Sequence, residues 1–236
     1  MKFSLKWVLF WTLPILFGIL SLSVGRYNID LVVQLKILVS QIIDIEQTWT
    51  DMEETVVMNI RLPRIILAML IGGGLSIAGA AFQGMFANPL VSPDILGVSA
   101  GSGFGAALGI LLLGHGYGAQ VLALVFGVLA IVFTFFISGM KKEMPVFMLV
   151  LAGVVTSALF QALISLIKFV ADPEDKLPSI TYWLMGSLGT ATYQDLWIGG
   201  PLIVIGILIL YVLRWRMNIL SLSDEEAKSL GISLTK

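Results

Sequence analysis

Residues 119–138, AQVLALVFGVLAIVFTFFIS, form a stretch of 20 residues without a charged side chain. A helix rises about 1.5 Å per residue, so this stretch can cross the ~30 Å hydrocarbon core of a bilayer. Similar apolar blocks recur along the chain, separated by short polar joints. The sequence therefore predicts an all-α membrane protein.

The composition of the chain agrees with this fold class. Of 236 residues, 58% are hydrophobic and only 12% charged, whereas soluble domains carry about 25% charged residues. Mean hydropathy is +0.97. The net charge of −1 provides no basic field that would attract nucleic acid, so we expect no nucleic-acid partner.

Hydropathy and helix breakers predict a polytopic bundle of about six transmembrane helices. The first apolar stretch, residues 7–24, follows two lysines as a signal peptide would, but its 18 residues exceed the apolar core of a cleaved signal, which has about 7 to 15. We expect a transmembrane bundle over residues 1–216 and a cytoplasmic segment over 217–236. The predicted spans are residues 7–24, 62–83, 93–113, 119–138, 144–170 and 196–215.

Two polar segments between the spans are predicted to lie on the outer side. The first contains an amphipathic pattern at residues 29–38, which favours a short helix along the membrane surface. The second, residues 172–193, is expected to form a brief helix over the outer end of the 144–170 span.

Basic residues near the span ends favour a cytoplasmic N-terminus. This orientation places Lys141, Lys142 and Arg214 inside, as the positive-inside tendency requires. Arg61 and Arg64 then lie outside, against the same tendency. An acidic partner on the outer side would explain these two arginines.

Small residues recur along two of the predicted spans. Residues 72–74 are glycines, and Gly97, Gly101, Gly105 and Gly109 follow one another at four-residue steps. Faces of small residues let helices approach closely in lipid, where no hydrophobic force drives their association. The pattern predicts a tightly packed bundle.

Residues for catalysis and metal binding are scarce. The chain has no cysteine and one histidine, His115, in a predicted loop, so we expect no metal site and no cofactor. No nucleophile and base can be paired, and no Gly-rich ATP-binding loop occurs. The protein is therefore not expected to be an enzyme, and any ATP would be hydrolysed by another chain.

The segment after the last span has the pattern of a short, capped helix. Ser223 can cap a first turn that contains Asp224, Glu225 and Glu226, and Gly231 can end the helix. Such a helix at the cytoplasmic face suits docking to a partner. A solvated connector is the alternative interpretation.

Ordered motifs over nearly the whole chain resemble the FecCD-type permease subunits of iron-siderophore, haem and cobalamin ABC importers. Members of that family have about ten spans, so the sequence is expected to correspond to the N-terminal six-span portion of such a permease. The motifs are NIRLPR at residues 59–64, GAAFQ at 79–83, NPL at 88–90, LGVSAG at 96–101, LAGV at 151–154, YWLMGSL at 182–188 and residues 220–231.

The resemblance implies roles for particular residues and partners. Arg61 and Arg64 would pair with glutamates of a periplasmic or lipid-anchored substrate-binding protein, and Asn88 and Leu90 would lie near the cytoplasmic closure of the pathway. A second permease copy would complete a dimer in the bacterial cytoplasmic membrane, among its lipids. The coupling helix that contacts a separate ABC ATPase would comprise Ser223, Asp224, Glu225, Glu226, Ala227, Lys228, Ser229, Leu230 and Gly231.

Two other functions stay open at this point. An ion-coupled secondary carrier or channel is disfavoured because acidic residues are absent from the span interiors, where such carriers place their coupling groups. A permease fragment that does not transport would fail to join an ATPase and a binding protein.

Overall fold

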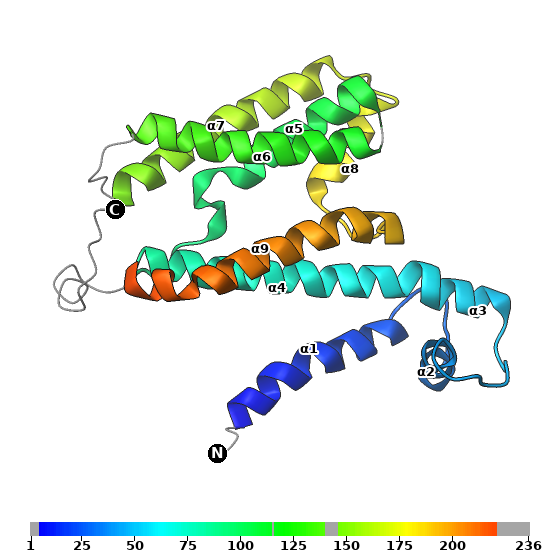
Figure 1. The fold of residues 1–236 in the computed structure, drawn as a ribbon. Coiled ribbons are helices and arrows are strands. Elements are labelled where there is room, and N and C mark those ends of the chain that lie inside the picture. The colour runs from blue at the N-terminus through cyan, green and yellow to red at the C-terminus, as the bar shows by residue number, and fades with distance from the viewer. Residues whose placement is uncertain (1–4, 115, 140–145, 221–236) are drawn as a thin grey trace. The chain divides into compact units, whose positions relative to one another are not determined.

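The computed structural model describes residues 5–114, 116–139 and 146–220. Across these three ranges the regular structure is helical, without strands (Figure 1). The predicted all-α class is confirmed. The chain divides into two compact units, residues 1–77 with 188–212 (unit 1) and residues 78–187 with 213–236 (unit 2).

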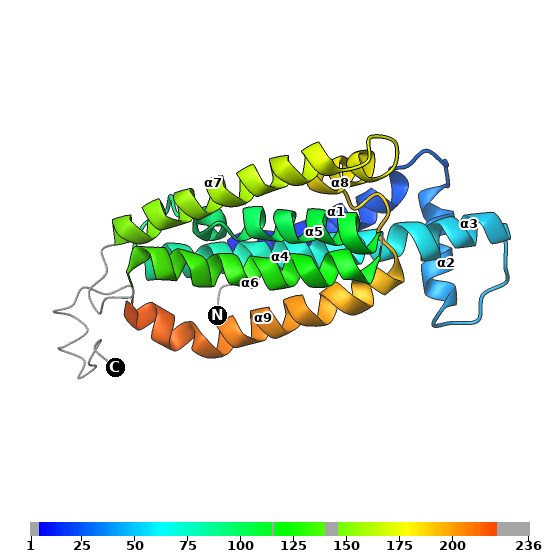
Figure 2. The same cartoon turned by 90° about the horizontal axis from the view of Figure 1, so that it is seen from above.

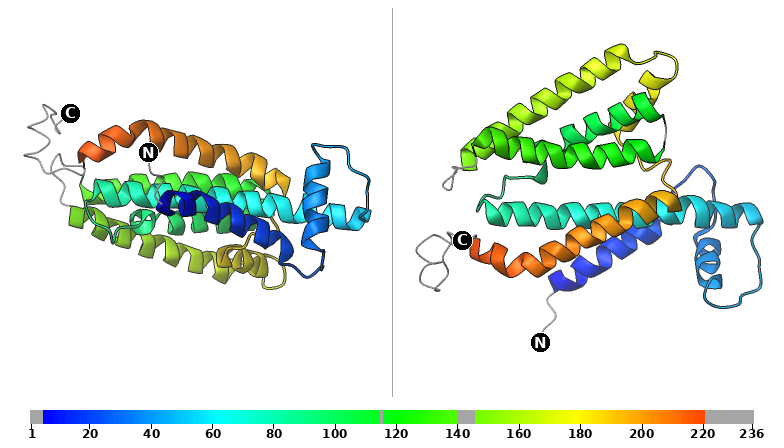
Figure 3. Two further views of the ribbon diagram at one scale, coloured as in Figure 1. Left: turned by 90° about the horizontal axis from the view of Figure 1, so that it is seen from below. Right: turned by 45° about the horizontal axis from the view of Figure 1, so that its top comes forward.

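Unit 1 is built on one long helical segment. Its helices are α1 (Leu5–Ser23), α2 (Leu31–Ser40), α3 (Asp51–Thr55), the π-helical turn η1 (Val56–Arg61), and the first parts of α4 (Leu62–Met85) and α9 (Tyr193–Leu220) (Figure 3). α3, η1 and α4 join into a continuous helix, Asp51–Met85. The helix starts before the predicted boundary at residue 62 because Thr50 and Glu53 form a capping box, in which each side chain accepts the backbone N–H of the other.

The short amphipathic helix predicted at residues 29–38 is confirmed as α2. Asp30 caps it by accepting a hydrogen bond from Val32 N at 2.9 Å. One face is buried with Ile37 in a small core that also contains Ile29, Trp49 and Val57. This core fixes α2 against η1.

Unit 2 is a packed group of helices. It contains the 3₁₀ turn η2 (Pro93–Leu96), α5 (Val98–Leu113), α6 (Tyr117–Ser138), α7 (Val146–Val170) and α8 (Lys176–Met185). α5, α6 and α7 lie side by side (Figures 1 and 2). Phe104, Phe126 and Phe160, one from each of these helices, meet with ring centroids 4.8 to 6.5 Å apart.

The single helix predicted over residues 93–113 is wrong, because the chain breaks at Gly97. Gly97 has φ +75°, a left-handed conformation that glycine adopts without strain. The break brings the Ile95 carbonyl against α7, where a Cβ added to Gly153 would lie 1.8 Å from that oxygen. A break between apolar helices leaves backbone groups that need partners in the protein, and Thr134 donates to the Leu96 carbonyl at 2.9 Å.

The predicted glycine face is confirmed on α5. Gly101, Gly105 and Gly109 lie against the backbone of α6, and a Cβ added to Gly105 would lie 2.1 Å from the Leu122 carbonyl oxygen. The four-residue spacing thus sets how closely the two helices pack.

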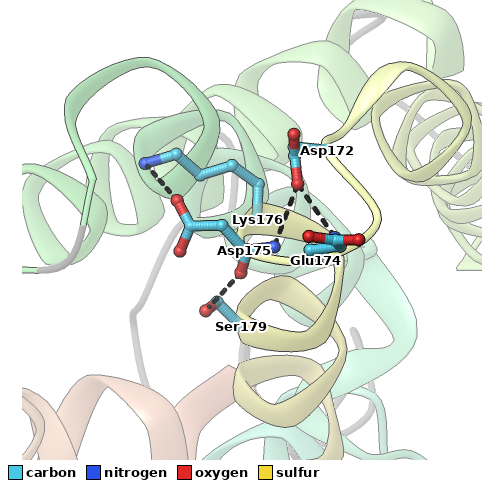
Figure 4. A network of polar contacts seen from close by, with 5 residues as sticks. All are labelled: Asp172, Glu174, Asp175, Lys176 and Ser179. Atoms are coloured by element: carbon cyan, nitrogen blue, oxygen red, sulfur yellow. Dashed lines mark hydrogen bonds and ion pairs between the residues drawn. The ribbon is translucent and has the colours of Figure 1, made fainter.

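The predicted brief helix at residues 172–193 is confirmed as α8. Asp172 Oδ1 accepts the backbone N–H groups of Glu174 and Asp175 at 2.8 and 3.0 Å, which turns the chain at the end of α7 (Figure 4). Ile180 of α8 is then buried with Ile167 and Ala171. α8 packs mainly against α5, through Ala107 and Ile110, and only Ile167 of α7 shares this core, so the expected packing over the end of α7 is a minor contact.

The described helices include four that are long and apolar enough to cross a membrane: Asp51–Met85, Tyr117–Ser138, Phe147–Val170 and Tyr193–Asn218. They match four of the predicted spans. Trp7–Ser23 and Val98–Leu113, which correspond to the other two predictions, are apolar helices of shorter length. α9 continues past residue 216, where we expected the transmembrane bundle to end.

We predict that Gly105→Ala destabilises the protein, because the new methyl group would overlap the α6 backbone. Overpacking of this kind costs about 1–3 kcal/mol. Thermal unfolding in detergent measures the change. Gly79→Ala is the matched control, since its Cβ would meet no atom within 4 Å and alanine favours a helix. Equal melting temperatures for both variants would contradict the role of the glycine face.

Candidate functional site

The residues predicted to carry function fall in three places. Arg61 and Arg64 lie in unit 1, where η1 meets α4, and Asn88 and Leu90 lie in unit 2, in the turn that follows α4. The predicted coupling helix, residues 223–231, and His115 lie outside the described residues. The first two places can therefore be built from their contacts.

Arg64 is half-buried and keeps donors for another group. Its Nη2 donates to the Gly189 carbonyl, while its Nε is buried and finds no acceptor among the described residues. The side chain borders a pocket of about 470 Å³ whose other walls include Phe17, Ile65 and Met69. Arginine has five N–H donors in a planar fork that fits a carboxylate, so Arg64 can accept an acidic partner here.

Arg61 has a different environment from Arg64. It is only 7% exposed, and it donates to the carbonyls of Leu22 and Tyr27. Its Nη1 also donates to Gln34 Oε1 at 3.1 Å. A carboxylate from another protein could bond the Arg61 guanidinium only by displacing these acceptors.

The turn at residues 87–90 is held by its own polar groups. Asn88 Oδ1 accepts the backbone N–H of Leu90 at 3.0 Å, an Asx turn that stabilises a reversal of the chain. Ala87 has φ +47°. The turn leaves Leu90 89% exposed, so an apolar side chain projects from a polar joint.

Two buried hydroxyls form a polar site that the sequence reasoning missed. Thr134 Oγ1 lies 2.8 Å from Thr156 Oγ1, and Thr156 donates to the Ala152 carbonyl at 2.8 Å. Both side chains are fully buried. Each hydroxyl lies within a long apolar stretch, and this feature of the sequence could have identified the pair.

The described residues offer little else for chemistry. They contain no group of three or more His, Asp or Glu side chains that could hold a metal ion. The arrangement is suited to docking through Arg64 and to contact through Leu90.

Comparisons with known proteins connect this chain to membrane transport. The family model described as the FecCD transport family matches residues 13–236. The chain is 37% identical over 222 residues to the molybdate import system permease protein MolB of Haemophilus influenzae, covering 94% of this chain and 65% of that protein. It is 42% identical over 180 residues to a probable iron chelatin transport system permease protein of Helicobacter pylori, covering 75% and 53%.

A solved structure has the same fold. It is described as an inward-facing conformation of a metal-chelate type ABC transporter, and it matches with a TM-score of 0.78 and 36% identity. The match covers 96% of this chain and 68% of the solved one. Against the two relatives named above, the chain spans about half to two thirds of their length.

We predict that Asn88→Ala destabilises the protein whereas Leu90→Ser does not, because Asn88 holds the turn together and the Leu90 side chain only projects from it. Loss of the Asn88 oxygen leaves the Leu90 N–H without its acceptor and costs about 1 kcal/mol. Leu90→Ser changes an exposed side chain, so the free energy of unfolding should move by less than about 0.5 kcal/mol. Thermal unfolding of both variants checks this, and a larger loss for Leu90→Ser would show that Leu90 has a buried partner.

Proposed function

Because the chain belongs to the FecCD transport family, we propose that it is the membrane permease part of an ABC importer. The match over residues 13–236 carries this proposal. The fold shared with a metal-chelate type transporter supports it. The protein would pass its solute through the membrane without catalysing a reaction, and a separate ATPase would supply the energy.

The cargo is proposed to be a metal-containing solute. One relative carries the name of a molybdate importer and another that of an iron chelatin transporter, so the family spans an oxyanion and bulky chelates. An iron-siderophore, haem or cobalamin-type chelate needs a wide, largely apolar path. Recognition of the particular cargo would belong to the substrate-binding protein.

The proposed orientation places the N-terminus in the cytoplasm of a bacterium whose inner membrane holds the bundle. Lys2, Lys6 and Arg216 then lie inside. In this orientation the helical segment Asp51–Met85 would cross the membrane, with Arg64 towards the outer side and the turn at residues 87–90 at the inner side. A second permease copy would complete the pathway.

The proposed docking site for the binding protein is centred on Arg64. Its half-buried guanidinium can receive a carboxylate through N–H groups that the Gly189 carbonyl does not occupy. Arg61 was predicted to share this role, but its burial and its three acceptors argue against direct contact with a partner. We therefore assign docking to Arg64.

The proposed transport cycle is alternating access. Closure of the ATPase pair would move the segment 223–231, and the bundle would then open inward. The exposed Leu90 lies in the turn that would close the inner end of the pathway.

We predict that Arg64→Glu weakens docking of the binding protein, because it replaces attraction to a carboxylate with repulsion. The affinity should fall by at least about tenfold at low salt, and the loss should shrink at high salt. Surface plasmon resonance with the reconstituted transporter measures this. Lys36→Glu is the matched control, with the same charge change at an exposed position of α2. Equal losses for both variants would exclude a specific site at Arg64.

We predict that replacing Lys228 and Ser229 with proline uncouples the ATPase, because both residues follow the first turn of the expected helix, where proline removes backbone donors and distorts the helix. Substrate-stimulated ATP hydrolysis in proteoliposomes with the ATPase and binding protein should be lost. Replacing the same two residues with alanine keeps the helix and should preserve most of the stimulation. Full stimulation in the proline variant would contradict the coupling role.

A further inference from the structure

We propose that Arg61 is a positioning residue, an internal clamp that fixes the outer segment 22–34 and thereby sets the place of Arg64. The proposal rests on the docking function assigned to Arg64 above. It gives different tasks to two arginines that the sequence motif presents as equivalent.

The clamp is built from backbone carbonyls. Arg61 Nη1 donates to the Leu22 carbonyl in the last turn of α1, and Nη2 donates to the Tyr27 carbonyl in the following loop. The last four carbonyls of a helix have no partner inside that helix. Arg61 therefore bonds an otherwise unpaired end of α1 and the loop that leaves it.

Gln34 extends the clamp to α2. Its side chain is fully buried. Its Oε1 accepts from Arg61 Nη1 at 3.1 Å, and its Nε2 donates to the Ile29 carbonyl at 2.8 Å. The amide thus connects Arg61 to the chain just before α2.

Gly25 leaves room for the guanidinium. A Cβ at Gly25 would lie 2.7 Å from Arg61 Nη2 and 3.1 Å from Cζ. Any larger residue would push the guanidinium away from its acceptors. A side chain that only needed to reach out of the protein would not require such a close fit.

The charge on Arg61 is stabilised without a carboxylate. Among the described residues no Asp or Glu forms an ion pair with it. The C-terminal end of α1 carries the negative end of the helix dipole, which favours a cation in this place. Removing Arg61 would therefore leave the buried Leu22 carbonyl and the part-buried Tyr27 carbonyl without this donor, which is costly.

The wall of one pocket connects Arg61 with Arg64. Arg61 and Arg64 border the same pocket, and Ser21 and Val24 form part of its wall on either side of Leu22. Arg61 holds this stretch by its bonds to Leu22 and Tyr27. If the stretch moves, the surroundings of Arg64 change although Arg64 itself is intact.

The first test reports on the clamp alone. The chain has no cysteine, so Ile29→Cys, at a position only 3% exposed, gives a single thiol whose maleimide labelling rate measures opening of the outer segment. We expect at least tenfold faster labelling when Arg61→Gln or Gln34→Leu is added, and an unchanged rate with Arg64→Gln. Gln34→Leu keeps the arginine, so this variant can still test the clamp if Arg61→Gln folds poorly. An unchanged rate in both clamp variants would overturn the proposal.

The second test is a double-mutant cycle on binding-protein affinity. Arg64→Gln should weaken docking about tenfold, and Arg61→Gln should weaken it by a smaller factor. A residue that acts through Arg64 gives non-additive effects, so the double variant should bind within about twofold of Arg64→Gln.

The outcomes separate the clamp from the docking function. Additive losses, with a lower salt dependence in each single variant, would make Arg61 a docking residue and overturn the proposal. If no variant changes docking while Ile29→Cys labelling still responds to Arg61→Gln, the assignment of docking to Arg64 fails and the clamp on segment 22–34 stands.

Discussion

A polar backbone group inside the hydrocarbon core has no water to bond, and this constraint governs the whole chain. It explains the helical structure of the described residues, since a helix satisfies its backbone groups within one segment. Where helices end or break, carbonyls left without a helical partner are bonded by side chains, as at two places in this chain. Where the chain breaks at Gly97, Thr134 bonds the Leu96 carbonyl. Where α1 ends, Arg61 bonds the Leu22 carbonyl. Polar side chains are placed where the helices leave carbonyls free.

The helices must also pack closely in lipid, which provides no hydrophobic force for their association. In unit 2 the glycines of α5 admit the α6 backbone, and Gly153 of α7 admits the Ile95 carbonyl. These contacts leave no space for a methyl group, so the helices hold defined positions. A permease that alternates between two openings needs such rigid parts, because motion can then be confined to a few turns. The exposed turn at Leu90 is one such turn in our account.

Much of this fold could be predicted from the sequence. The length of the apolar stretches predicted the long helices, and the four-residue glycine spacing predicted the packing face of α5. The break at Gly97 was missed because hydropathy does not register one glycine in a left-handed conformation. The burial of Arg61 was missed because it depends on carbonyls far away in sequence. Motif resemblance gave both arginines one role, and only the contacts distinguish them.

The central claim is that the outer docking surface and the segment 223–231 lie on opposite sides of the membrane. Because the chain contains no cysteine, single substitutions report their side without background. Asp44→Cys, exposed in the loop after α2, and Glu225→Cys can be treated with a membrane-impermeant maleimide on intact spheroplasts. We predict labelling of Asp44→Cys at once and of Glu225→Cys only after the membrane is permeabilised. Labelling of both from the outside would contradict the account.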